Sequence, residues 1–191
     1  MTILSQPFGV EPAYHPSGVI RQDVLTNGIA SGYATVIWTN SPVKFATDGT
    51  LIVVGTGADV AVGVFCGCEF SSAGKFFVSP YWPAAQTYDN DGFMQAYFTS
   101  DKDIVYIAQA DGAVAQTANW EGINLVDATT AHGSTFTGFS QQRLNHTTTG
   151  ATAATFQVVG LEETGKYGPN QWGDAFTILK VKISSYQGQI A

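Results

Sequence analysis

Short apolar runs of β character recur along the chain from Gly32 onward. Residues 176–183 give the clearest pattern, because apolar side chains alternate there with Lys180 and Lys182, as in a strand with one buried face. The other runs are short and rich in β-branched and aromatic residues, which favour strands. These predicted strands are residues 33–39, 43–45, 50–54, 61–68, 75–79, 93–99, 103–108, 123–126 and 156–161.

Turn signals between the runs indicate antiparallel pairing. The dipeptide Asp48-Gly49 is a hairpin signal, and residues 100–102 predict a second tight hairpin that joins the runs on either side of them. The one candidate for a helix is the short segment 113–121. The pattern therefore predicts an all-β fold with little helix, an antiparallel β-sandwich or barrel of the jelly-roll or β-tulip kind.

The first thirty residues have a different character. Residues 1–30 carry Pro7, Pro12 and Pro16 together with several glycines, and they lack apolar periodicity. We expect them to form an extended N-terminal arm that precedes a β-rich domain of residues 31–191. Such an arm docks either on a neighbouring molecule or on its own domain, and the sequence leaves both arrangements open.

Composition suggests that part of the surface is covered by other subunits. Charged residues make up 12% of the chain, against about 25% in a typical soluble domain, and aromatic residues make up 13%. The buried centres of protein interfaces are poor in charge and rich in aromatic residues. The alternative is an ordinary β protein whose surface is rich in Thr, Ser and Asn.

The charge pattern argues against nucleic acid as a partner. The net charge is −7, and the eight Lys and Arg residues are scattered along the chain. Binding to phosphate needs clustered basic residues. No run approaches the roughly 18 apolar residues of a membrane helix, and the N-terminus lacks the features of a secretory signal. We therefore expect neither a nucleic acid nor a membrane as partner.

Cys66 and Cys68 are the only cysteines. On a strand they would point to the same face, about 6.6 Å apart along it, which suits a disulfide badly. The histidines, His15, His132 and His146, are distant in sequence, so a metal site lacks further ligands. We expect two reduced, packed thiols.

No motif points to catalysis or to a cofactor. Residues 55–60 begin like a dinucleotide-binding loop, but they lack the third glycine and lead into a strand. The acidic groups Glu162-Glu163 and Asp89-Asn90-Asp91 lie in predicted loops, and the second lacks the spacing of a calcium-binding EF-hand. We therefore expect no catalytic residue, no metal and no cofactor, and we interpret the chain as a protein that is not an enzyme.

The four tryptophans admit two interpretations. Exposed aromatic side chains on β-sandwiches can stack on sugars, whereas buried ones anchor cores or interfaces. The residues concerned are Trp38, Trp82, Trp120 and Trp172.

Several weak motifs, taken in order, resemble one protein family. The chain opens with QPFG (residues 6–9), passes through VGVF (62–65), and has a Thr/Ala/Gly-rich stretch (147–154). A strand, a turn containing YGPN (167–170) and a final strand follow. This order is similar to that of the capsid decoration, or cement, proteins of tailed bacteriophages.

The resemblance implies a structural protein of the virion. It would be made in the cytoplasm of the host bacterium and bind the outer surface of the capsid as a homotrimer. There it would bridge subunits of the major capsid protein and stabilise the expanded shell. The candidate interface residues are Pro7, Phe8, Tyr14, Trp82 and Trp172. The alternative function is that of a carbohydrate-binding or tail-associated adhesin module.

Overall fold

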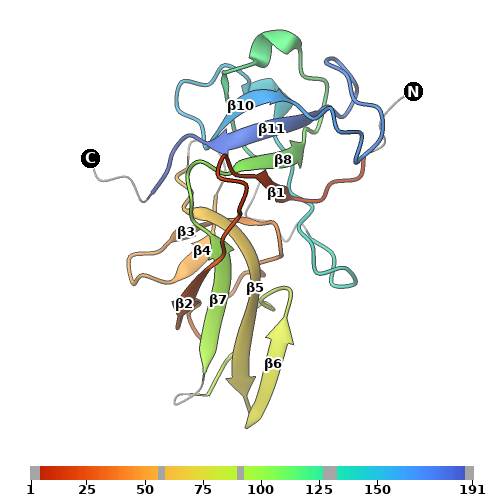
Figure 1. The fold of residues 1–191 in the computed structure, drawn as a ribbon. Coiled ribbons are helices and arrows are strands. Elements are labelled where there is room, and N and C mark those ends of the chain that lie inside the picture. Colours follow the sequence, from red (N-terminus) through yellow and green to blue (C-terminus); the bar gives the residue numbers. More distant parts are fainter. Residues whose placement is uncertain (1–4, 56–58, 90–92, 127–132, 188–191) are drawn as a thin grey trace.

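The chain folds into two antiparallel β-sheets that pack together, an arrangement consistent with a β-sandwich (Figure 1). A computed structural model describes residues 5–55, 59–89, 93–126 and 133–187. Within these ranges the helical elements are two short 3₁₀ turns, η1 (Gln116–Ala118) and η2 (His146–Thr148). The predicted all-β class with little helix is confirmed. No helix in the described ranges has the length and apolar character needed to span a membrane.

The five-stranded sheet lies in the upper part of Figure 1. Its strands in spatial order are β1 (Val10–Tyr14), β8 (Val105–Gln109), β11 (Ile178–Ile183), β10 (Phe156–Leu161) and β9 (Gly122–Ile123). The interior strand β8 is buried along its whole length, and its residues from Val105 to Ala108 are apolar. In β11 the predicted alternation is present, because Leu179 and Val181 are buried whereas Lys180 and Lys182 are half-buried.

The six-stranded sheet lies in the lower part of Figure 1. Its main path is β2 (Asp23–Thr26), β7 (Met94–Thr99), β5 (Gly63–Ser72), β3 (Pro42–Phe45) and β4 (Leu51–Val53). The sixth strand, β6 (Lys75–Ser79), pairs with the second half of β5.

Two hairpins organise this sheet. The predicted hairpin between β3 and β4 is confirmed, and Gly49 supplies the positive φ, 81°, that its turn requires. The hairpin between β5 and β6 turns at Ala73 and Gly74, both with positive φ. The Asp89 carboxylate accepts hydrogen bonds from the backbone N–H groups of Ala73 and Gly74 at 2.9 and 3.1 Å.

Three predicted local elements are wrong. Residues 33–39 do not form a strand, and only Ile37 and Thr39 make isolated β-bridges there. Residues 100–102 do not close a hairpin, because β7 belongs to the six-stranded sheet and β8 to the five-stranded one. This segment is instead a crossover between the sheets, and β8 obtains both of its neighbours, β1 and β11, from distant parts of the chain. The segment 113–121 forms only the single turn η1, since the backbone N–H of Trp120 donates to Val158 of β10.

The extended N-terminal arm predicted for residues 1–30 is not confirmed. Val10–Tyr14 is the edge strand β1 of one sheet, and Asp23–Thr26 is the edge strand β2 of the other. Val10 and Ile29 are fully buried. Strands β1 and β2 and the side chain of Ile29 are therefore part of the folded β-sheet structure.

Each sheet contributes most of one hydrophobic core. The first core gathers side chains of the five-stranded sheet around Tyr106 and Phe156, and it also includes Val64 of β5. The second core gathers Phe65 and Trp82 with other residues of the six-stranded sheet. Tyr186 packs against both cores, so the C-terminal segment helps to join the two sheets.

Candidate functional site

The register of the β5–β6 hairpin determines which side chains point away from the second core. Directly opposite residues of an antiparallel pair lie on the same face of a sheet. Phe70 lies opposite Phe77, and Phe70 is buried in the core. Phe76 and Val78, one position to either side of Phe77, therefore point to the other face. We call this side of the six-stranded sheet the outer face.

Four apolar side chains are exposed on the outer face. Phe76 is 60% exposed, Val78 71%, Phe93 42% and Val24 52%. The rings of Phe76 and Phe93 lie 5.7 Å apart. Val24 lies on the same face because it pairs with Tyr97 of β7, while its neighbour Leu25 packs against the core.

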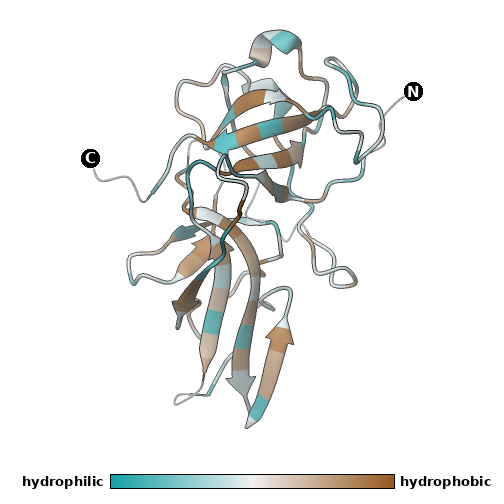
Figure 2. Cartoon of the chain, viewed as in Figure 1, coloured by the Kyte–Doolittle hydropathy of each residue, from teal (hydrophilic) through white to brown (hydrophobic). Residues whose placement is uncertain are grey.

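Polar side chains separate the apolar residues of the outer face. In the register of the sheet, Glu69 lies between Val78 and Gln95, and Ser71 lies opposite Phe76. A mixture of apolar anchors and polar groups is the usual composition of a protein-binding surface. Figure 2 shows β6 as hydrophobic over most of its length, at the free margin of the sheet.

Other exposed aromatic residues lie outside this face. Phe136 is 96% exposed and Phe139 46%, in a loop that packs at Gly138 against Pro80. Trp120 is 66% exposed on a backbone with φ of 69°. The described surface thus has several apolar positions available to a partner.

The N-terminal candidates contact the chain itself. The ring of Phe8 stacks on Tyr167 with centroids 4.2 Å apart, and Glu11 accepts hydrogen bonds from both Lys166 and Tyr167. Pro7 is half-buried next to Phe8. The residues around β1 therefore dock on the loop between β10 and β11, the second of the two arrangements left open by the sequence. Tyr14, at the end of β1, is 50% exposed.

Trp82 does not fit the predicted role of an interface residue. Its side chain is fully buried in the second core, where its ring contacts Phe70 and Tyr88. It therefore offers no surface to a partner or to a sugar. Trp38 is also buried, against Tyr81.

Trp172 lies beside a surface hollow. The hollow has a volume of about 420 Å³ and is lined by residues of the β10–β11 loop, including Glu162, Glu163 and Asn170. Glu162 is only 2% exposed, and its Oε1 accepts a hydrogen bond from the backbone N–H of Thr164 at 2.8 Å. Trp172 itself is half-buried and packs against the first core. Trp172 belongs to the β10–β11 loop and Phe8 packs on the same loop, whereas Trp82 lies in the second core.

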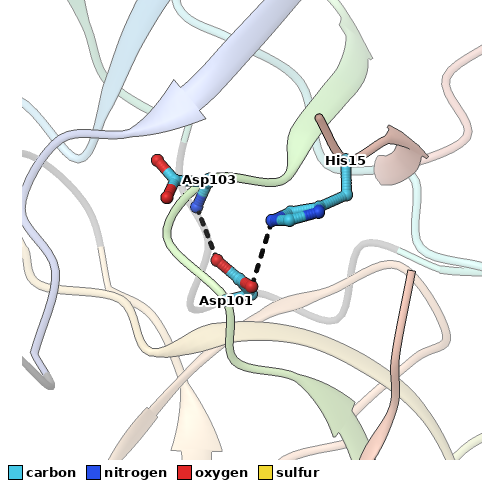
Figure 3. Close-up of side chains that lie close together, drawn as sticks. All are labelled: His15, Asp101 and Asp103. Atoms are coloured by element: carbon cyan, nitrogen blue, oxygen red, sulfur yellow. Dashed lines mark hydrogen bonds and ion pairs between the residues drawn. The ribbon is translucent and has the colours of Figure 1, made fainter. Parts of the chain in front are cut away.

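A histidine and two aspartates meet where the chain crosses between the sheets (Figure 3). Nε2 of His15 lies 3.1 Å from Oδ2 of Asp101, and the backbone N–H of Asp103 donates to Oδ1 of Asp101 at 2.8 Å. On the other side of the imidazole ring, Nδ1 accepts the backbone N–H of Ser17 at 3.1 Å.

These contacts tie the three residues to one another and to Ser17 within the chain. Because Nδ1 of His15 accepts a hydrogen bond, the ring proton lies on Nε2, which then donates to Asp101. Oδ1 of Asp103 lies 3.7 Å from Nζ of Lys182, so this carboxylate also has a cationic neighbour within the chain. The cluster fastens the β1–β2 connection to the crossover.

The two cysteines are free thiols in this structure. Burial raises the pKa of Cys66 to about 11 and that of Cys68 to about 12. A β-bulge between Phe65 and Gly67 shifts the register, so that Cys68 faces the core and Cys66 is half-buried.

The lysines lie apart and several are paired with acidic residues. Nζ of Lys44 lies 2.7 Å from Asp59, and Lys180 lies 4.0 Å from Glu162. The dinucleotide-like loop and the acidic turn after Asp89 fall partly outside the described residues, at positions 56–58 and 90–92. His132 also lies outside the described residues.

No family model, curated protein or solved structure matches this chain. The function must therefore be argued from the surface itself. Sequence reasoning missed the outer face, although one signal was present. Phe76, Phe77 and Val78 are consecutive, and alternating side chains of a strand point to opposite faces, so apolar residues had to occupy both.

Proposed function

We propose that this chain is a structural protein that decorates the outer surface of a bacteriophage capsid. In this role it binds subunits of the major capsid protein and copies of itself, and it stabilises the expanded shell. The trimeric arrangement on the shell follows from the family resemblance. The chain acts by the area that it buries and needs no catalytic group.

The observation that supports this function best is the outer face of the six-stranded sheet. Phe76, Val78, Phe93 and Val24 are exposed there, on a chain with few charged residues. Exposed apolar anchors mixed with polar groups on one sheet face are typical of a protein-binding surface. A large shell offers many copies of one shallow site, and a bound subunit that bridges two of them gains affinity through effective concentration.

Binding to shells tests the proposal. Purified chain is added to expanded phage shells from which it has been removed, and the pelleted protein is measured against concentration. We expect saturation at a fixed ratio to the major capsid protein. The substitution V24K places a charge on the outer face and should weaken binding about tenfold or more.

The control is V19K. Val19 is 57% exposed, close to the 52% of Val24, but it lies in the β1–β2 connection away from the outer face. It should bind as the unaltered chain does. An unaltered chain that stays in the supernatant would contradict the proposed function, and equal binding by both variants would contradict the role of the outer face.

The hollow at Trp172 supports a second candidate function, carbohydrate binding. An indole beside carboxylate and amide groups is a suitable surface for a sugar ring and its hydroxyls. Titration with glycans should then quench tryptophan fluorescence, and W172A should abolish the quenching while W120A leaves it unchanged. Unaltered fluorescence across a glycan panel would leave the capsid role as the only proposal.

A further inference from the structure

The free edge of β6 is an open site for another strand. Among the described residues β6 pairs with β5 alone, and Figure 1 shows it at the margin of the molecule with no labelled strand beyond it. Natural edge strands are usually protected by a proline, a bulge or a charged residue within the strand. Residues 75–79 contain no proline, the β5–β6 register has no bulge, and the one charge, Lys75, lies at the end of the strand.

The sequence of β6 is complementary to itself in one antiparallel register. With a twofold axis through Phe77, that residue lies opposite its copy, Phe76 lies opposite Val78, and Lys75 lies opposite Ser79. Apolar side chains then meet apolar side chains. The two Lys75 charges are four residues apart along the strands, about 13 Å, which is beyond the screening length at physiological salt.

This register also preserves the two faces of the sheet. Phe76 and Val78 both belong to the outer face, and Phe77 belongs to the face of the second core. A slip by one residue would place core-facing residues opposite outward-facing ones. A slip by two would leave part of each five-residue strand without a partner.

We propose that β6 pairs with β6 of a second copy of this chain, so that two six-stranded sheets join into one continuous sheet. The pairing covers Phe77, which is 42% exposed at the edge of the core, and it aligns Phe76 of each copy with Val78 of the other. It also satisfies the backbone groups on the open edge of the strand.

The contact has twofold symmetry, since each copy contributes the same strand. It is therefore separate from the threefold contact that the family resemblance implies. The inference does not depend on a role in the capsid, because strand pairing is measured on the isolated protein. On a shell it would link copies that do not share a threefold axis.

Cysteine cross-linking tests the register directly. In F77C the two new thiols face each other across the axis, at a separation that a disulfide can bridge. In F76C or V78C alone, identical residues are diagonal neighbours and lie too far apart. Mixing F76C with V78C should restore the cross-link, because these two positions are directly opposite in the pair.

The expected result is a disulfide dimer on a non-reducing gel from F77C and from the mixture, and none from F76C or V78C alone. The unaltered chain, with its half-buried Cys66 and buried Cys68, gives the background. If F77C fails to fold, the mixture still tests the register. Cross-linking of neither F77C nor the mixture, or equal cross-linking of all variants, would overturn the proposal.

Sedimentation gives an independent measurement. V78K places an ammonium group opposite Phe76 and should raise the dissociation constant of the dimer about tenfold or more. V24K, on the same face but on β2, should leave it unchanged within about twofold. Since V24K is also the shell-binding variant, loss of shell binding with intact self-association separates the two proposals. Equal effects of V78K and V24K, or no association of the unaltered chain, would overturn the strand pair.

Discussion

At the scale of the residue, the packing of Gly63 shows how closely strands β5 and β7 approach each other. A Cβ atom at this position would lie 1.3 Å from the carbonyl oxygen of Thr99 on β7. Any side chain must therefore push the two central strands apart. A Cβ atom added to Gly160, in β10, would meet no neighbouring atom within 4 Å, so a methyl group fits there.

These two glycines make a matched pair of variants. We expect G63A to lower the free energy of unfolding by about 3 kcal/mol, because overpacking against backbone cannot be relieved by a change of rotamer. G160A should change it by less than about 1 kcal/mol. Urea unfolding measures both values. Equal unfolding midpoints for the two variants would contradict the described β5–β7 contact.

The buried thiols predict a chemical property. With the pKa of Cys66 raised from 9.0 to about 11, the thiolate fraction at pH 8 is about 100-fold lower than in an unfolded chain. We expect slow labelling by a disulfide reagent at pH 8, faster labelling as the pH rises toward 11, and immediate labelling in denaturant. Rapid labelling of the native protein at pH 8 would show that these thiols are exposed.

The same pKa shifts predict alkaline sensitivity. The folded protein holds the thiol protons more tightly than the unfolded chain does, so their contribution to stability is complete below about pH 9. It is lost as the pH rises from 9 through the folded-state pKa values of about 11 and 12.

Single residues were the level at which sequence reasoning was least certain. It treated Phe8 and Trp82 alike, as aromatic anchors for a partner. The structure gives them different environments, because Phe8 stacks on Tyr167 at the surface and Trp82 is enclosed by the second core. Such a difference depends on tertiary contacts, which residue type does not encode: Phe8 contacts Tyr167, whereas Trp82 contacts Phe70 and Tyr88.

At the scale of the element, many strands were predictable, but of their partners only the β3–β4 hairpin was. The runs at 43–45, 156–161 and 176–183 correspond to β3, β10 and β11 because local alternation and β propensity identify a strand. The crossover at 100–102 was mistaken for a hairpin because a short polar connection is compatible with both arrangements. Only the pairing of β8 with β1 and β11 distinguishes them.

The N-terminal strands give a prediction at this scale. Deleting residues 1–30 removes β1 and β2 together with the buried Val10 and Ile29, so each core loses part of its cover. We expect loss of cooperative thermal unfolding. An independent docking arm would instead leave the melting temperature unchanged and reduce only binding to the shell. Circular dichroism melting curves of both chains decide between these outcomes.

At the scale of the whole molecule, low charge and exposed apolar residues have one physical explanation in common. A net-acidic chain with few charges that leaves Phe76, Val78 and Phe93 on an open sheet face gains stability when a partner covers them. Composition favoured a surface covered by other subunits, and the register of β5 and β6 identifies the outer face as the candidate for it. The family resemblance supplied the expected partner, the capsid.

The central claim is that many copies of this chain cover a capsid, and copy number tests it most directly. Quantitative mass spectrometry of purified phage particles that carry the chain gives its ratio to the major capsid protein. The account predicts a ratio near one, or a large simple fraction of it. A handful of copies per particle, or none, would contradict it.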